Sequence, residues 1–234
     1  MRKLLINILC GFIPGRQARK RIRTRLNNPI IKQMAKFAKK FSANKKPKIK
    51  YTYGYRCTNF VVNVDDVWVF KFPLNNNDGK EKSIREKRIT DSLRPFSPIK
   101  IPDMEIIEWN GMYVRKYECV RGIGFHGLSE SDKNKYAPKI AKQLAEYLYA
   151  VGMADPVEIR DLKPDPKAKP AKAYGWSNND VWDNFILDKK TFDVIAIIDW
   201  EDAIFSNFES RLKNGTGNTA IKEALMREYL KLFE

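Results

Sequence analysis

The chain has 234 residues, a formal net charge of +16 and 43% hydrophobic residues. This length and composition suit a globular protein with one large domain or two small lobes, and they exclude a wholly disordered chain. Three widely spaced cysteines are typical of a reducing compartment. With a single histidine in the chain, a histidine-ligated metal cluster and a Ser-His-Asp triad are poor expectations.

The positive charge is concentrated at the N-terminus. Residues 1–50 hold 16 Lys or Arg and no acid, whereas the remaining residues carry 28 charges of each sign. The apolar run Leu4–Ile13 is about ten residues long, and a bilayer span needs roughly twenty. Further apolar residues recur among the basic ones at near-helical spacing: Ile22, Leu26, Ile30, Ile31, Met34, Phe37, Ala38 and Phe41.

A basic amphipathic arm of this kind favours an anionic membrane surface, because apolar burial and charge attraction add together. Two alternatives stay open: the apolar face packs on the protein itself, or the arm binds nucleic acid. Nucleic acid is the least favoured, because aromatic residues are few in the arm and no binding motif appears. We therefore expect a cytoplasmic protein, peripheral on the inner face of the membrane. The oligomeric state stays open.

From Tyr51 onward the pattern changes to strands. The segments Phe60–Val64 and Val67–Phe72 are rich in β-branched and aromatic residues, and an Asp-Asp turn joins them. Alternation along the second segment places Lys71 on the face opposite its two phenylalanine neighbours. A lysine inside such a strand needs a partner, because burying an unpaired ammonium is costly.

The next segment, Lys80–Leu93, predicts a helix that carries Glu81 and Glu86. The other expected elements are two or three strands within 97–122, an amphipathic helix at Lys139–Val151, a Pro/Lys-rich loop at Asp155–Tyr174 and a closing helix at Thr219–Phe233.

An acid-rich hairpin, GWSNNDVWDNFILDKKTFDVIAIIDWEDA, follows this loop. It places Asp180, Asn184 and Asp199 at the ends of two short strands. Asp and Asn are turn formers, and residues 188–191 are typical of a hairpin connection. Oxygen ligands at the ends of adjacent strands also suit a hard cation such as Mg²⁺. The hairpin by itself is consistent with both interpretations.

The running order of a strand lysine, a helix glutamate, more strands, a helix and an acid-rich hairpin is typical of a kinase. VIAIIDWEDA and DVWDNFILD resemble the metal-binding strand end and the catalytic loop of the aminoglycoside phosphotransferase and choline kinase branch of the kinase-like fold. The resemblance covers residues 51–205, and these two segments together carry most of its specificity.

The resemblance implies an α+β, two-lobed protein kinase-like fold with a compact C-terminal lobe and a basic helical N-terminal extension. The implied parts are the extension at 1–50, a nucleotide-binding lobe at 51–118 and a catalytic lobe at 119–234. The implied activity is ATP- and Mg²⁺-dependent transfer of a phosphate to a hydroxyl of a small molecule, a sugar or a lipid-linked envelope glycan.

The resemblance also implies residue roles. Asp180 would be the catalytic base, and Asn184 and Asp199 would bind the metal. The nucleotide would be held by Asn59 in the covering loop, Lys71 as the phosphate lysine, Glu86 as its partner with Glu81 in reserve, and Tyr117 and Cys119 at the adenine-contacting hinge.

The sequence departs from the family pattern in the catalytic loop. Asn178 stands where the family has a histidine, and Asp180 and Asn184 are four positions apart instead of five. At strict spacing Asn179, which cannot act as a base, falls on the catalytic position. A one-residue deletion is the simpler account. An inactive kinase-like module that the basic arm recruits to a membrane stays as the alternative. The nucleotide loop is poor in glycine, with Gly54 alone.

A rival catalytic loop lies upstream. IRDLKPD, residues 159–165, resembles a protein-kinase catalytic loop with Asp161 as its aspartate. No asparagine follows at the right place, and Asp161 lies 38 residues before Asp199, whereas Asp180 lies 19 before it. We therefore favour Asp180 and leave Asp161 as the alternative.

The first residues carry a second, shorter resemblance. Phe12-Ile13-Pro14 and the basic run Arg19-Lys20-Arg21 are similar to the openings of bacterial lipopolysaccharide and capsule biosynthesis proteins. The resemblance implies a pathway context and no particular chemistry.

Overall fold

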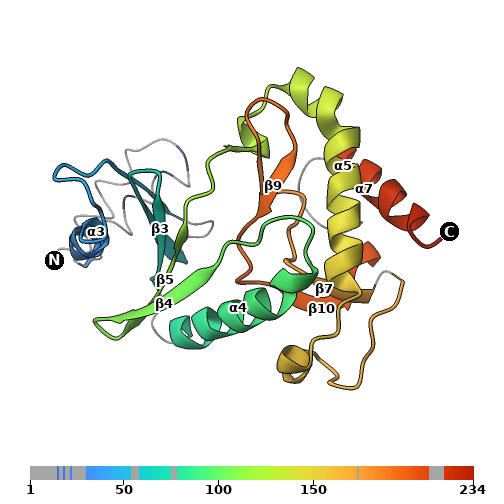
Figure 1. The fold of residues 1–234 in the computed structure, drawn as a ribbon, viewed down its shortest axis with the longest axis horizontal. Coiled ribbons are helices and arrows are strands. Elements are labelled where there is room, and N and C mark those ends of the chain that lie inside the picture. Colours follow the sequence, from blue (N-terminus) through green and yellow to red (C-terminus); the bar gives the residue numbers. More distant parts are fainter. Residues whose placement is uncertain are drawn as a thin grey trace. The chain divides into compact units, whose positions relative to one another are not determined.

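The computed structural model of the chain describes residues 30–53, 58–74, 78–172, 174–210 and 219–234, together with Gly15, Ala18 and Ile22. Residue contacts divide it into two units, Met1–Ser83 with Glu105–Cys119, and Ile84–Met104 with Val120–Glu234. Figure 1 shows the elements of both units. Most of the arm, including its apolar run, and Gly54 lie outside the described residues, so the expectations for them stay predictions.

The first unit contains a five-stranded sheet in the order β1-β2-β3-β5-β4. The predicted turn between its second and third strands is confirmed, since Asp65 and Asp66 have φ angles of 58° and 54°. Hairpin turns of the mirror-image type require such positive values, which Asp tolerates better than most residues. The strands are β1 (Ile49–Tyr53), β2 (Asn59–Val64), β3 (Trp68–Pro73), β4 (Met104–Trp109) and β5 (Met112–Glu118).

Helix α3 (Ile31–Lys39) packs on this sheet through its apolar side. Met34 and Ala38 are 1% and 0% exposed. The ring of Phe37 stacks on that of Trp109 with the centroids 4.9 Å apart. The alternative in which the apolar face of the arm packs on the protein therefore holds for α3. The predicted boundary at residue 50, between the basic extension and the nucleotide-binding lobe, stays a prediction, but α3 is part of the first unit.

The second unit is organised around α5 (Glu130–Gly152), with α7 (Thr219–Lys231) lying along it (Figure 1). Helix α5 begins nine residues before the predicted Lys139. The Ser129 side chain caps it by accepting the N–H of Asp132 at 3.1 Å. The first turns carry few apolar residues, so hydrophobic spacing did not predict them.

The remaining elements of this unit are short, except for α4. The unit also contains two small sheets, β6-β8-β9 and β7-β10. All of their strands except β6 follow α5 in the chain. Helix α4 (Gly79–Leu93) confirms the prediction for this segment and spans both units. The short elements are η2 (Arg94–Phe96), η3 (Phe125–Gly127), η4 (Val157–Leu162), β6 (Ile123–Gly124), β7 (Tyr174–Ser177), β8 (Phe185–Leu187), β9 (Val194–Ile197) and β10 (Ile204–Asn207).

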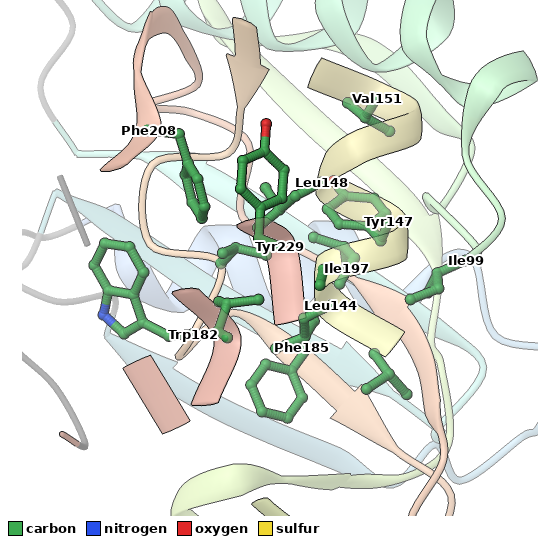
Figure 2. Packing of buried hydrophobic residues seen from close by; sticks show 14 of the residues in the cluster. Ile99, Leu144, Tyr147, Leu148, Val151, Trp182, Phe185, Ile197, Phe208 and Tyr229 are labelled. Carbon is green, nitrogen blue, oxygen red and sulfur yellow. The ribbon is translucent and has the colours of Figure 1, made fainter. Parts of the chain in front are cut away.

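A single apolar cluster holds these elements on the two helices (Figure 2). Leu144 and Tyr147 from α5, Tyr229 from α7 and Phe185 from β8 all belong to this cluster. Strand β7 passes so close to the end of α5 that a Cβ atom on Gly175 would contact the backbone of Gly152. A side chain at this position would push away the strand that leads into the predicted catalytic loop.

The loop after α5 is held by a cluster of charges around Asp155. Its carboxylate accepts hydrogen bonds from Lys163 (2.5 Å), Lys169 (2.8 Å) and Arg160 (2.9 Å). The side chain of Lys163 is fully buried and also lies over the ring of Phe205, 4.4 Å from its centroid. Burial raises the pKa of Asp155, but the three hydrogen bonds outweigh it and hold the pKa well below its usual range.

This cluster predicts a pH-dependent stability. Asp155→Asn should lower the free energy of unfolding by about 3 kcal/mol or more at pH 7, because a buried ammonium loses its counter-charge. The folded state binds the Asp155 proton more weakly than the unfolded chain, so this stabilisation is complete above about pH 4 and is lost below it. In urea unfolding, the difference in unfolding free energy between wild type and variant should stay constant above about pH 4 and narrow from there towards pH 2.

Glu146→Gln is the matched control, because Glu146 is a half-exposed carboxylate of α5 that lies 3.9 Å from Lys142. It should cost little at any pH. A gap between Asp155→Asn and wild type that stays constant with pH would contradict the assignment of the charge cluster.

None of the helices in the described ranges has the length and apolar content needed to cross a bilayer.

Candidate functional site

The predicted catalytic loop lies between β7 and β8 and is closed by its own backbone. The carbonyl of Asp180 accepts the N–H groups of Asp183 and Asn184, both at 3.0 Å. Val181 and Trp182 are 0% and 2% exposed and belong to the apolar cluster of the second unit. Figure 2 shows Trp182 in this cluster. Burial of these two side chains fixes the loop and leaves the side chain of Asp180 exposed to solvent.

Asn184 and Asp199 lie at the same end of the β8–β9 pair. Phe185 is opposite Ile197, and the N–H of Ile198 donates to the carbonyl of Asn184 at 2.9 Å. Asp199 follows at once, is exposed, and has a φ of 60°. A left-handed non-glycine residue costs of order 1–3 kcal/mol and occurs often at functional sites.

These two residues fit the donor chemistry of Mg²⁺. The ion takes oxygen ligands, commonly one or two protein side chains completed by phosphate oxygens and water. Asp199 offers a carboxylate and Asn184 an amide oxygen. Among the described residues, no group of three or more His, Cys, Asp or Glu could hold a metal ion. Phosphate and water would therefore have to supply the other ligands.

Helix α4 holds the turn that follows Asp199. Glu86 is 2% exposed and its Oε1 accepts the N–H of Trp200 at 3.1 Å. The neighbouring Arg85 donates to the carbonyl of Ala203 at 2.7 Å. Glu81 is exposed, so burial favours Glu86 as the functional glutamate of this helix. Its pairing with Lys71, a residue of the other unit, stays a prediction.

The rival aspartate has a different environment. Asp161 lies on η4, its side chain is 62% exposed, and Arg88 donates to both of its oxygens at 2.8 and 3.1 Å. The hydrogen bonds from Arg88 lower the pKa of Asp161. A carboxylate that is stabilised in its charged form by an arginine is a weaker proton acceptor.

Two of the nucleotide-binding residues predicted in the first unit, Lys71 and Asn59, lie on the same face of the sheet. Lys71 is 6% exposed and Asn59 is 3% exposed. Lys71 pairs in register with Arg115, so both point to the face opposite the phenylalanine core. Arg115 is fully buried and donates to Oδ1 of Asn59 at 2.6 Å.

Sequence reasoning missed Arg115. Its alternation with the buried Met112 and Val114 would have placed it on the same face as Lys71.

The predicted hinge residues end strand β5. Tyr117 is opposite Val69, and the N–H of Cys119 donates to the carbonyl of Val67 at 2.8 Å. The thiol of Cys119 accepts a hydrogen bond from Asn63 at 3.2 Å. These bonds fix the end of the strand, while the predicted adenine contact stays a prediction.

The only histidine lies next to the catalytic loop, which the sequence did not indicate. His126 Nε2 is 3.5 Å from Oδ1 of Asp183. Burial raises the pKa of Asp183, and the charges of His126 and Lys222 act in the opposite direction. The pair joins η3 to the loop between Asp180 and Asn184.

Comparison with known proteins finds similarity in structure alone. No family profile and no curated protein sequence matches the chain. A GDP complex of wild-type aminoglycoside 2'-phosphotransferase-IIIa superposes with a TM-score of 0.60 at 16% identity, over 86% of this chain and 83% of that one. Macrolide 2'-phosphotransferase MphH from Brachybacterium faecium gives 0.54 at 14% identity, over 85% and 82%.

A third match is a complex of the aminoglycoside phosphotransferase APH(2")-IIa with streptomycin and ATP. Its TM-score is 0.53 at 13% identity, over 87% of this chain and 84% of that one. The chain therefore has the α+β, two-lobed kinase-like fold of these phosphotransferases, and the fold class expected from the sequence is confirmed. At these identities the comparison establishes the fold and leaves the activity to be argued from the site.

Proposed function

We propose that the chain is a phosphotransferase that moves the γ-phosphate of ATP to a hydroxyl group of a small molecule. The observation that carries this proposal is a pair of backbone hydrogen bonds at one end of the β8–β9 pair, from the N–H of Asn184 to Asp180 and from the N–H of Ile198, the residue before Asp199, to Asn184. An exposed carboxylate beside a carboxylate–amide pair is the donor set that phosphoryl transfer to an alcohol requires.

In the proposed reaction the acceptor oxygen attacks the γ-phosphorus, the bond to the β–γ bridging oxygen breaks, and ADP leaves. Asp180 orients the acceptor hydroxyl and takes its proton. Asn184 and Asp199 would hold Mg²⁺, which supplies neutralisation of phosphate charge. Lys71 would contact the nucleotide phosphates with Glu86 as its partner, Asn59 would help to cover the nucleotide, and Tyr117 and Cys119 would contact the adenine.

We further propose that the acceptor is a sugar hydroxyl, on a free sugar or on a lipid-linked envelope glycan. Solved structures with this fold include complexes with kanamycin and streptomycin, which supports a small hydroxyl-bearing acceptor. The similarity of residues 12–21 to envelope biosynthesis proteins points to the envelope context.

The test is formation of ADP by the purified full chain with ATP, Mg²⁺ and a panel of sugar acceptors. Acceptor- and Mg²⁺-dependent turnover would support the proposal. Tight ATP binding without turnover on any acceptor would favour the inactive binding module. Failure to bind ATP at all would leave only the fold in common with the phosphotransferases.

A second proposal concerns the basic arm, which would bring the protein to an anionic membrane surface. Four exposed lysines lie on α3 and on the residue that caps its C-terminal end: Lys32, Lys36, Lys39 and Lys40. Because the apolar side of α3 is buried in the first unit, attraction at this helix would be electrostatic, without insertion. No exposed aromatic residue of α3 offers a stacking platform, which argues against single-stranded nucleic acid.

We expect the quadruple change of these lysines to alanine to weaken binding to vesicles containing phosphatidylserine. At about 1 kcal/mol per lysine near the surface, the loss should reach roughly a hundredfold or more at low salt. Sedimentation with vesicles measures it. Four exposed lysines of the second unit serve as the control set: Lys135, Lys142, Lys189 and Lys190.

Equal losses in both sets would show that only net charge matters. Binding that is insensitive to salt or to the change in α3 would contradict an electrostatic surface on this helix.

A further inference from the structure

The first residue of the catalytic loop makes a buried link to the strand that carries Asp199. Asn178 is 1% exposed, and its Nδ2 donates to the carbonyl of Ile198 at 3.2 Å. The carbonyl of Asn178 accepts the N–H of Asp180 at 3.0 Å. One residue therefore contacts both the backbone of the proposed base and the backbone next to the proposed metal ligand.

Ile198 is held on both of its backbone polar groups. Its carbonyl accepts from Asn178, and its N–H donates to Asn184 at 2.9 Å. Asn178 and Asn184 stand on either side of Asp180 in the chain, and Ile198 directly precedes Asp199. The two ends of the loop are thus tied to a single residue of the strand end, an arrangement we call the Ile198 clamp.

The side chain of Asn178 uses only its donor in this arrangement. Its Oδ1 is buried and has no hydrogen-bond partner among the described residues. Exchanging the amide oxygen and nitrogen would set Oδ1 against the carbonyl of Ile198, and two acceptors repel. An unsatisfied buried acceptor costs about 1–3 kcal/mol, which an apolar residue of the same size would avoid. Stability alone therefore does not account for an amide at this position.

We propose that Asn178 is a positioning residue for phosphoryl transfer: through the Ile198 clamp it fixes the separation of Asp180 and Asp199. The inference rests on the proposed function and concerns the same site. It also bears on the loop that is one residue short, since the clamp sets the position of Asp180 by hydrogen bonds to the strand end. A displacement of about 1 Å between reacting groups can lower a rate by around 100-fold.

The experiment compares Asn178→Leu, Asn178→Asp and Asn178→His with wild type in Mg²⁺-dependent ADP formation from ATP. Leucine and aspartate keep the size but lack the donor, so kcat should fall by about 10- to 100-fold while KM for ATP stays within about twofold. Histidine supplies an N–H donor and should recover most of the lost kcat. If the role of Asn178 were purely structural, the substitutions would lower the amount of folded enzyme but would leave kcat per folded molecule unchanged.

Gln143→Leu is the matched control, because Gln143 is an amide side chain bonded to the other end of β9. Its Oε1 accepts the N–H of Val194 at 2.9 Å, and its Nε2 donates to Asp193 at 2.8 Å. The substitution should reduce stability while leaving kcat per folded molecule unchanged. Equal kcat losses in Asn178→Leu and Gln143→Leu would overturn the positioning role.

Amide hydrogen exchange tests the clamp without any turnover. Asn178→Leu should speed exchange at the N–H groups of Asp180 and Ile198 at least tenfold more than Gln143→Leu does. If the wild type never turns over ATP but this exchange difference is present, the proposed function fails and the clamp stands as a structural link. If exchange at Asp180 and Ile198 is unaffected, the inference is wrong whatever the activity.

Discussion

Asp199→Asn should abolish Mg²⁺-dependent turnover and leave the fold intact. Asparagine keeps the size of the side chain and tolerates the φ of 60° as well as aspartate does, and the position is exposed. What is lost is the negative charge that the proposed metal site needs. Removing a residue that only hydrogen-bonds to a metal ligand commonly costs 10- to 100-fold in metal affinity or activity, so loss of a direct ligand should exceed about 100-fold.

The measurement is ADP formation over a range of Mg²⁺ concentrations, with thermal unfolding of each variant as the check on folding. Asp103→Asn is the control, because Asp103 is 84% exposed in its side chain and belongs to the same unit. It should behave as wild type. A folded Asp199→Asn protein with unchanged activity would remove Asp199 from the site.

Asp180→Asn should lower kcat by about 10²- to 10⁴-fold, the usual contribution of a general base. Asp180 is exposed within the loop, and its carboxylate is the only group in the proposed mechanism that takes the acceptor proton. Asp161→Asn should leave kcat within about twofold of wild type, since the side chain of Asp161 is exposed and already forms an ion pair with Arg88. The two single variants differ only in which aspartate loses its charge, so each is the control for the other.

Kinetics with a saturating acceptor and ATP separate these variants. If Asp161→Asn is the more damaging of the two, the loop at residues 159–165 supplies the base and the DNFIL register is wrong. If neither substitution affects turnover, neither of these two aspartates acts as the base, and positioning with metal would account for the rate.

The sequence by itself determined the local elements. Period-two alternation predicted β2 and β3, and the two aspartates between them predicted a turn that the backbone confirms. Alternation also placed Lys71 opposite the phenylalanine core, which the register bears out. These predictions hold because hydrophobic period and turn chemistry act between residues close in the chain.

The tertiary structure decided what the apolar side of α3 packs against. The sequence of the arm favoured a membrane surface and left packing on the protein as an alternative, because an amphipathic helix only requires some apolar partner. The phenylalanines of β2 and β3 supply that partner, and they lie in a separate strand pair that the arm's own sequence does not indicate.

The environment of each acid was likewise decided by contacts between distant residues. Arg88 and Asp161 are 73 positions apart, and Asn178 and Ile198 are 20 apart. No local pattern encodes such pairs. The sequence could therefore name Asp180, Asn184 and Asp199 as candidates, but only folding brings Asn184 beside Ile198 and pairs Asp161 with an arginine, because hydrogen bonds and ion pairs depend on distance in space and not along the chain.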